Sequence, residues 1–131
     1  MGSDLIEAWA AGWSAHDPER LVAVFREDCV YEDIPLGIVS RGREDLREFI
    51  RDWLRSSPDI VMRLQNTINT GAHAGAEWTF SGTQEGELAD IAPTGRRFEL
   101  RGASFFELDS EGISRCCDYW DLADLQRQLG Q

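Results

Sequence analysis

The chain has 131 residues, of which 42% are hydrophobic, and its formal net charge is −11 at neutral pH. This length and composition suit one folded domain, which we expect to span residues 1–131. The charge argues against binding to nucleic acid or to an anionic membrane surface, and no apolar run approaches the roughly 20 residues of a membrane span.

The first part of the chain predicts three helices. Apolar residues in the segment 5–13 follow helical spacing, and Ser3-Asp4 can cap this first helix. Asp17-Pro18 can begin a second helix, whose apolar stripe reaches Phe25. The third helix, at residues 44–56, has apolar residues spaced i, i+3, i+4, i+7 and i+8, which predicts one buried face.

The rest of the pattern is typical of strands. A short strand at residues 29–33 places Tyr31 and Asp33 on one face, because strand side chains alternate. Further strands are expected at residues 60–70, 74–83, 94–108 and 113–120. The acidic segment 84–93 is irregular, Gly112 ends a hairpin turn at positive φ, and a short helix follows the last strand.

Helices followed by a run of mostly antiparallel strands indicate an α+β fold. We expect a curved sheet of four to six strands that wraps around the three N-terminal helices. The result would be a cone-shaped α+β barrel with an apolar pocket. The other face of the sheet would then meet solvent or form a dimer contact.

The last strand carries the residue that most needs a chemical explanation. Cys116, Asp118 and Trp120 share one face of it, so a carboxylate lies between a thiol and an aromatic ring. Such an acid must be hydrogen-bonded, have a shifted pKa or face a cavity. The alternative is an acid that pairs with Arg115 or a neighbouring strand. Asp121 competes if the register differs, although its place before the helix favours an N-cap.

Several motifs carry a family resemblance. They are Trp13-Ser14-Ala15-His16-Asp17, Tyr31-Glu32-Asp33-Ile34-Pro35, Pro93-Thr94-Gly95-Arg96 and Asp118-Tyr119-Trp120-Asp121-Leu122. With these motifs the chain resembles the nuclear transport factor 2-like superfamily over nearly its whole length. Within it, the chain looks most like SnoaL-like polyketide cyclases and limonene epoxide hydrolases, and more distantly like ketosteroid isomerases. One scaffold of this kind hosts many chemistries.

The resemblance to limonene epoxide hydrolases is incomplete at the site. These enzymes hold a water with a Tyr and an Asn and activate it with an Asp-Arg-Asp arrangement. Tyr31 and Asp118 match that pattern, whereas Asp33 occupies the position of the Asn. The segment around Glu85 and Glu87, where the Arg should lie, contains none.

The other two groups place different demands on the chain. Ketosteroid isomerases use an Asp base in a context that Asp33 resembles, and their oxyanion donors correspond to Trp9 and the Ala103-Ser104 region. SnoaL-like cyclases need an apolar pocket and one carboxylic acid with a raised pKa. Asp118 is the candidate for that acid.

The resemblance therefore implies a cofactor-independent acid/base enzyme, an isomerase or aldol-type cyclase, on a small apolar carbonyl compound. Asp118 would be the general acid/base, with Asp33 and Tyr31 orienting substrate or water. The alternatives are an epoxide hydrolase and a non-catalytic module for small-ligand binding or dimerisation. The aromatic residues expected to contact the substrate are Trp9, Trp53, Trp78, Phe80, Phe106 and Trp120.

The remaining expectations concern cofactors, partners and location. Neither His16 nor His73 lies in a metal-ligand spacing, so we expect no metal and no cofactor. The odd cysteine count and the absence of a basic segment followed by an apolar one at the start favour reduced thiols in a cytoplasmic protein. We expect a homodimer formed through the sheet, and no nucleic-acid or membrane partner.

Overall fold

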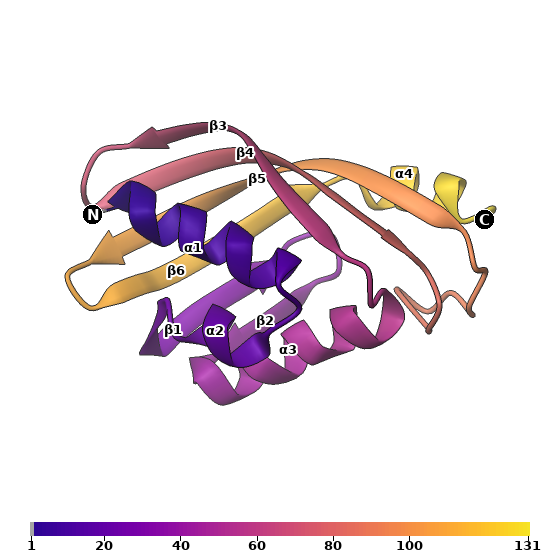
Figure 1. Cartoon of the computed structure of the whole chain (residues 1–131), viewed down its shortest axis with the longest axis horizontal. Coiled ribbons are helices and arrows are strands. Elements are labelled where there is room, and N and C mark those ends of the chain that lie inside the picture. The colour runs from indigo at the N-terminus through magenta and orange to yellow at the C-terminus, as the bar shows by residue number, and fades with distance from the viewer. Residues whose placement is uncertain (1) are drawn as a thin grey trace.

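The computed structural model describes residues 2–131, with side chains described from Asp4 onward. It shows an α+β fold in which helices pack on a six-stranded mixed sheet (Figure 1). The helices are α1 (Gly2–Ser14), α2 (Pro18–Val22), α3 (Gly42–Ser56) and α4 (Leu122–Gln128). The strands are β1 (Phe25–Asp33), β2 (Ile38–Arg41), β3 (Val61–Asn69), β4 (His73–Thr83), β5 (Arg97–Asp109) and β6 (Gly112–Trp120). No helix within residues 2–131 has both the length and the hydrophobicity that crossing a membrane requires.

The helices follow the predicted pattern, with two differences at their ends. The Asp17 carboxylate accepts hydrogen bonds from the backbone N–H groups of Glu19 and Arg20, so it caps α2 as predicted. The expectation that α2 reaches Phe25 is wrong, because Phe25 pairs with Ile113 in the sheet and begins β1. α1 begins at Gly2, ahead of the predicted cap, and the side chain of Ser3 lies outside the described residues.

The sheet has the strand order β2-β1-β6-β5-β4-β3. Every neighbouring pair is antiparallel except β1 and β6, which are parallel. β2 was not predicted, because two of its four residues are exposed apolar side chains, Ile38 and Val39, and do not form the usual alternation.

The sheet curves around the helices but is not closed into a barrel, so the predicted barrel is corrected to an open sheet. β2 and β3 are its two edges and do not pair with each other. α1 packs against β3 and β4, whereas α3 packs against β1 and β2. α1, α2 and α3 therefore occupy the space between the two edges, on one side of the sheet, whereas α4 packs against β5 (Figure 1).

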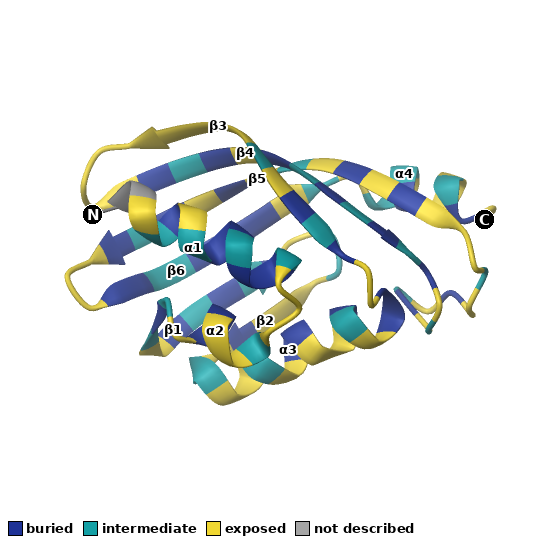
Figure 2. Ribbon diagram, viewed as in Figure 1, coloured by how far each residue is buried: buried dark blue, intermediate teal, exposed yellow. Residues whose placement is uncertain are grey.

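One apolar core fills the space between these helices and the sheet (Figure 2). Phe49, Ile50 and Trp53 of α3 are buried, as their spacing predicted. Trp78 and Phe80 of β4 also face inward. Burial of these apolar side chains stabilises the fold by roughly 25 cal/mol per Å² of apolar surface removed from water.

The strand register places the polar residues of the core in one row. Asp33 of β1 is the partner of Asp118 of β6, and Asp118 is in turn the partner of Ser104 of β5. Neighbouring strands lie about 4.8 Å apart, so these three side chains are near neighbours on the inner face. This row of polar side chains forms the base of the candidate active site.

Candidate active site

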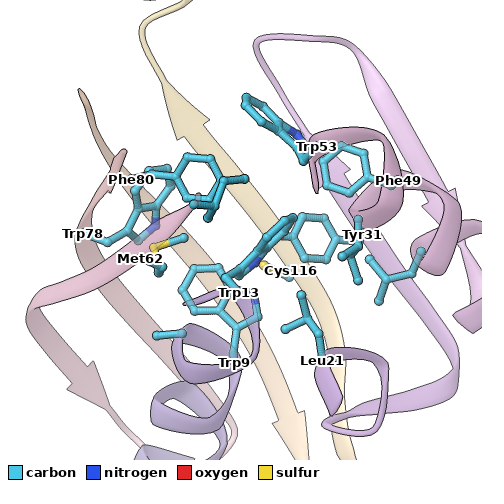
Figure 3. Packing of buried hydrophobic residues seen from close by; sticks show 14 of the residues in the cluster. Trp9, Trp13, Leu21, Tyr31, Phe49, Trp53, Met62, Trp78, Phe80 and Cys116 are labelled. Carbon is cyan, nitrogen blue, oxygen red and sulfur yellow. The ribbon is translucent and has the colours of Figure 1, made fainter. Parts of the chain in front are cut away.

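A cavity lies between α1, α3 and the inner face of the sheet. Its aromatic wall consists of Trp13, Phe49, Trp53, Trp78, Phe80 and Trp120. Figure 3 shows Phe49 and Trp53 facing Trp78, Met62 and Phe80 across the core. The cavity measures ≈ 20 Å³, which is room for a water molecule but not for a larger ligand.

Three polar residues of the predicted site, Tyr31, Asp33 and Asp118, line this one cavity. Asp33 is only 2% exposed and Asp118 only 7%. Tyr31 and Asp33 lie on the inward face of β1, and Asp118 lies on the inward face of β6, as the strand alternation predicted. The structure thus brings together the three residues that were predicted to be catalytic.

Asp118 accepts hydrogen bonds from three donors. The Tyr31 hydroxyl donates to Asp118 Oδ2 at 2.6 Å, and the Ser104 hydroxyl donates to Oδ1 at 2.6 Å. The Cys116 thiol donates to Oδ1 at 3.5 Å. Arg115 instead pairs with Glu107, so the alternative in which it neutralises Asp118 does not describe this strand.

The donors and the burial act on Asp118 in opposite directions. Burial raises the pKa of Asp118 to about 6, while the hydrogen bonds from Ser104, Tyr31 and Cys116 lower it. Burial also raises the pKa of the Tyr31 phenol well above its ordinary value, and the nearby Asp118 adds to that rise. Tyr31 therefore keeps its proton at neutral pH and acts as a donor.

Asp33 has weaker support for its negative charge. Its Oδ1 accepts a hydrogen bond from the backbone N–H of Leu36 at 3.2 Å, so it also caps the turn after β1. Burial raises the pKa of Asp33 to about 7, with a further contribution from the charge of Asp118, while hydrogen bonds from the Leu36 N–H and from Trp120 lower it. Burial therefore favours a proton on the pair, and Asp33, which has fewer hydrogen-bond donors, is the better place for it.

The six aromatic residues predicted to contact the substrate do not all reach the cavity. Four of them line it: Trp53, Trp78, Phe80 and Trp120. Trp9 and Phe106 are not among the lining residues and pack against each other edge to face, with ring centroids 5.0 Å apart. They belong to the core behind the site.

Asp121 takes the structural role. It lies at the N-terminus of α4 and accepts a hydrogen bond from the backbone N–H of Asp124. Its carboxylate is exposed and points away from the cavity that Asp118 faces. The register of β6 therefore places Asp118 in the cavity lining, where Asp121 has no part.

Two contributions to the site were not predicted. Ser104 was noted only as the counterpart of an oxyanion residue, yet it contacts Asp118 directly and accepts a hydrogen bond from the Trp78 indole at 2.9 Å. Trp13 lines the cavity, and its Nε1 is buried without a hydrogen-bond partner in the described part of the chain. Only the cross-strand register could have revealed the contact of Ser104 with Asp118. The sequence offers no signal that Trp13 lines the cavity.

An outer groove adjoins the cavity. It has a volume of ≈ 810 Å³ and is lined by the β1–β2 turn, the second half of α3 and the segment 86–90. Phe49 and Trp53 line both the groove and the cavity, so they form the partition between them. No arginine is among the residues described as lining the cavity, whose acids are Asp33 and Asp118.

Comparison with solved structures finds other proteins with the same fold. TsrD from Streptomyces laurentii is 31% identical, with a TM-score of 0.87 over 98% of this chain and 93% of that chain. IdmH from Streptomyces antibioticus, described as a proposed polyketide cyclase, is 23% identical, with a TM-score of 0.83 over 98% of each chain.

A protein from Catenulispora acidiphila with a ketosteroid isomerase-like fold, solved with trimethylamine, is 23% identical. Its TM-score is 0.87 over 97% of this chain and 92% of that chain. No curated protein sequence matches the chain significantly. The family model described as SnoaL-like polyketide cyclase matches residues 3–129. The chain therefore belongs to the SnoaL-like polyketide cyclase family, within the nuclear transport factor 2-like superfamily.

Proposed function

We propose that this protein is a cofactor-independent acid/base enzyme that catalyses an aldol-type cyclisation or an isomerisation of a small apolar carbonyl compound. The observation that carries the proposal is the pairing of Asp33 with Asp118 across β1 and β6, inside one aromatic cavity. Burial raises the pKa values of both adjacent carboxyls, so that one can carry a proton while the other is ionised, which would supply an acid and a base together.

The hydrogen bonds support a division of roles between the two carboxyls. Asp118 receives three donors, which favour its carboxylate form and make it the base. Asp33 has less support for a charge and retains its proton to higher pH, which makes it the acid. Each group thus has a pKa close to the working pH, where proton transfer is most efficient.

The proposed reaction moves one proton and forms one bond. Asp118 takes the proton from an acidic C–H beside a carbonyl, and the electron pair left on carbon forms the new C–C bond to a second carbonyl carbon. The C=O π electrons move to that oxygen, which receives the Asp33 proton. Proton return from Asp118 to its neighbour Asp33 restores the starting state. An isomerisation uses the same groups but returns the proton to a different carbon.

The Trp13 indole N–H is the donor available to the substrate oxygen. It is buried and unpartnered in the described part of the chain, and leaving such a group without an acceptor costs about 1–3 kcal/mol. A carbonyl oxygen in the cavity that Trp13 lines would supply this acceptor. The donor would then stabilise negative charge as it develops on the oxygen.

The family supports the same class of reaction, because its description is that of polyketide cyclases. The proposed polyketide cyclase activity of IdmH, a protein of the same fold, agrees with it. Since Phe49 and Trp53 separate the cavity from the outer groove, we propose that the substrate enters by displacing these two side chains.

The experiment follows base-catalysed C–H exchange, which needs no knowledge of the natural substrate. Ethyl benzoylacetate, an aryl β-keto ester, is incubated in D₂O buffer, and NMR records the loss of its methylene proton signal with and without the protein. We expect exchange above the buffer rate for the wild type. Asp118→Asn should reduce the excess rate by at least about 10²-fold, the usual contribution of a general base.

Asp124→Asn is the matched control, because Asp124 lies on α4 and outside the cavity lining. It should leave the exchange rate unchanged. Unaltered exchange in a folded Asp118→Asn variant would refute the proposal. No excess exchange by the wild type, together with tight binding of the ester by Asp118→Asn, would instead favour the non-catalytic binding module.

A further inference from the structure

Three side chains from three neighbouring strands form a hydrogen-bonded chain that ends on Asp118. The Trp78 indole N–H of β4 donates to Ser104 Oγ of β5 at 2.9 Å. The Ser104 hydroxyl then donates to Asp118 Oδ1 of β6 at 2.6 Å. Ser104 is 4% exposed and Trp78 also 4%, so water does not compete for these bonds.

A glycine makes this chain sterically feasible. Gly102 is the cross-strand partner of Trp78, and a Cβ at position 102 would lie only 2.3 Å from the Trp78 ring. Because Gly102 has no side chain, the indole lies flat across β5 and reaches Ser104, two residues further along that strand. The close approach is specific to the Trp78–Gly102 position, since a Cβ at Gly75, in the same pair of strands, would meet nothing closer than 3.9 Å.

We propose that Trp78 is a positioning residue that acts on Asp118 through Ser104, by fixing the direction in which the Ser104 hydroxyl donates its proton. The proposal deepens the function proposed above and rests on it for its catalytic meaning. Gly102 is the part of the device that lets the indole reach its partner.

The chemistry of the two donors sets the direction. An indole N–H can only donate, whereas a serine hydroxyl donates one hydrogen bond and accepts up to two. Ser104 Oγ accepts the hydrogen bond from the Trp78 N–H, so its own hydroxyl proton points to the acceptor within reach, Asp118 Oδ1. Linked hydrogen bonds also strengthen one another, by about 10–30% per bond, so the indole increases the support that Ser104 gives to the carboxylate.

Other titratable groups face Asp118 and must be separated from this effect. They are Asp33 and Tyr31 on β1 and Cys116 on β6. None of the three contacts Trp78 by a hydrogen bond in the described structure, so removing the indole N–H changes only the Ser104 branch.

A double-mutant cycle read by NMR tests the proposal without any substrate. The protein is labelled with ¹³Cγ-aspartate, and the Asp118 signal, assigned with Asp118→Asn, is titrated with pH. Trp78→Phe should raise the apparent pKa of Asp118 by about half a unit, and Ser104→Ala should raise it by about one unit. In the Ser104→Ala background, Trp78→Phe should have no further effect.

Trp53→Phe is the matched control, because it also shortens an indole in the cavity wall but has no link to Ser104. It should leave the apparent pKa of Asp118 unchanged. An equal rise from Trp78→Phe with and without Ser104 would overturn the proposal, since Trp78 would then act through packing or solvent exclusion. No change in either background would overturn it as well.

A second measurement covers the case in which Trp78→Phe does not fold. In the otherwise unaltered protein, the ¹⁵N–¹H resonance of the Trp78 indole should titrate with the same apparent pKa as Asp118, and this dependence should disappear in Ser104→Ala. An indole resonance that ignores the Asp118 titration refutes the link.

The role of Trp78 and the proposed function can fail independently of each other. If C–H exchange fails but the cycle behaves as expected, the hydrogen-bonded chain is real and the function is wrong. If exchange succeeds but the cycle does not, the function stands without a role for Trp78.

Discussion

Replacing Asp33 by Asn should stabilise the protein at neutral and alkaline pH. The carboxyl is 2% exposed and lies beside Asp118, and its burial raises its pKa from 3.8 to about 7. An Asn has nearly the same shape, and its Oδ1 can still accept the hydrogen bond from the Leu36 N–H. The substitution therefore removes a buried charge while keeping the cap of the turn.

The sign follows from proton binding in the two states. Between pH 4 and pH 7, approximately, folded Asp33 holds a proton that the unfolded chain has already lost, so the free energy of unfolding falls as the pH rises. A rise of about three pKa units corresponds to about 4 kcal/mol at about 1.4 kcal/mol per unit. Burying the Asn amide offsets part of the gain, so we expect Asp33→Asn to be about 2–4 kcal/mol more stable at pH 8.

Urea unfolding, followed by far-UV circular dichroism between pH 4.5 and 8.5, measures this difference. The gain should shrink towards zero as the pH falls to about 4.5, where the wild-type carboxyl is protonated in the folded protein. Unchanged m-values would show that both variants expose the same surface on unfolding.

Asp90→Asn is the control, since Asp90 is exposed and its positive φ of 63° suits Asn. Its stability should follow that of the wild type at every pH, within about 0.5 kcal/mol. The reasoning about Asp33 is refuted if its Asn variant and the wild type keep a constant difference across this pH range, or if the variant is the less stable at pH 8.

Three further predictions follow from single contacts. Gly102→Ala should lower the free energy of unfolding, measured with urea, by about 1–3 kcal/mol, because its Cβ would overlap the Trp78 ring. Gly75→Ala should change it by less than about 1 kcal/mol, and equal losses would contradict the packing argument. Tyr31→Phe removes a donor to Asp118, so the pKa of Asp118 should rise and the acid limb of the pH–rate profile for C–H exchange should move to higher pH. An unmoved limb would argue against Asp118 as the base. Asp121→Ala should lose the cap of α4, about 1 kcal/mol, with exchange intact; loss of exchange in the folded variant would return Asp121 to the site.

The sequence predicted the parts of the fold that depend on local patterns. The buried stripe of α3, the cap at Asp17 and the turn at Gly112, whose φ is 132°, all follow from residue spacing or backbone preference. The end of α2 was mispredicted because Phe25 satisfies helical spacing but gains more by pairing in the sheet. β2 was missed because an edge strand with exposed apolar residues leaves no alternation to detect.

The site was predictable to the level of strand faces. Alternation alone placed Tyr31 with Asp33 on one strand and Asp118 on another, and the family resemblance brought them into one pocket. The parallel pairing of β1 with β6 joins residues about 85 positions apart, which no local pattern contains. The same holds for Ser104, whose contact with Asp118 depends on the β5–β6 register.

In the proposed mechanism, the number of donors on each carboxyl, more than burial, decides which one acts as the base. Both acids are buried, and burial alone would raise both pKa values and leave the proton shared without preference. Tyr31, Ser104 and Cys116 converge on Asp118, so its charge is stabilised before any substrate arrives, and Asp33 keeps the proton. Loss of these donors would raise the pKa of Asp118 towards that of Asp33 and blur the division between acid and base. The identity of the proposed base therefore depends on the register of β1, β5 and β6 as a whole, and not on Asp118 alone.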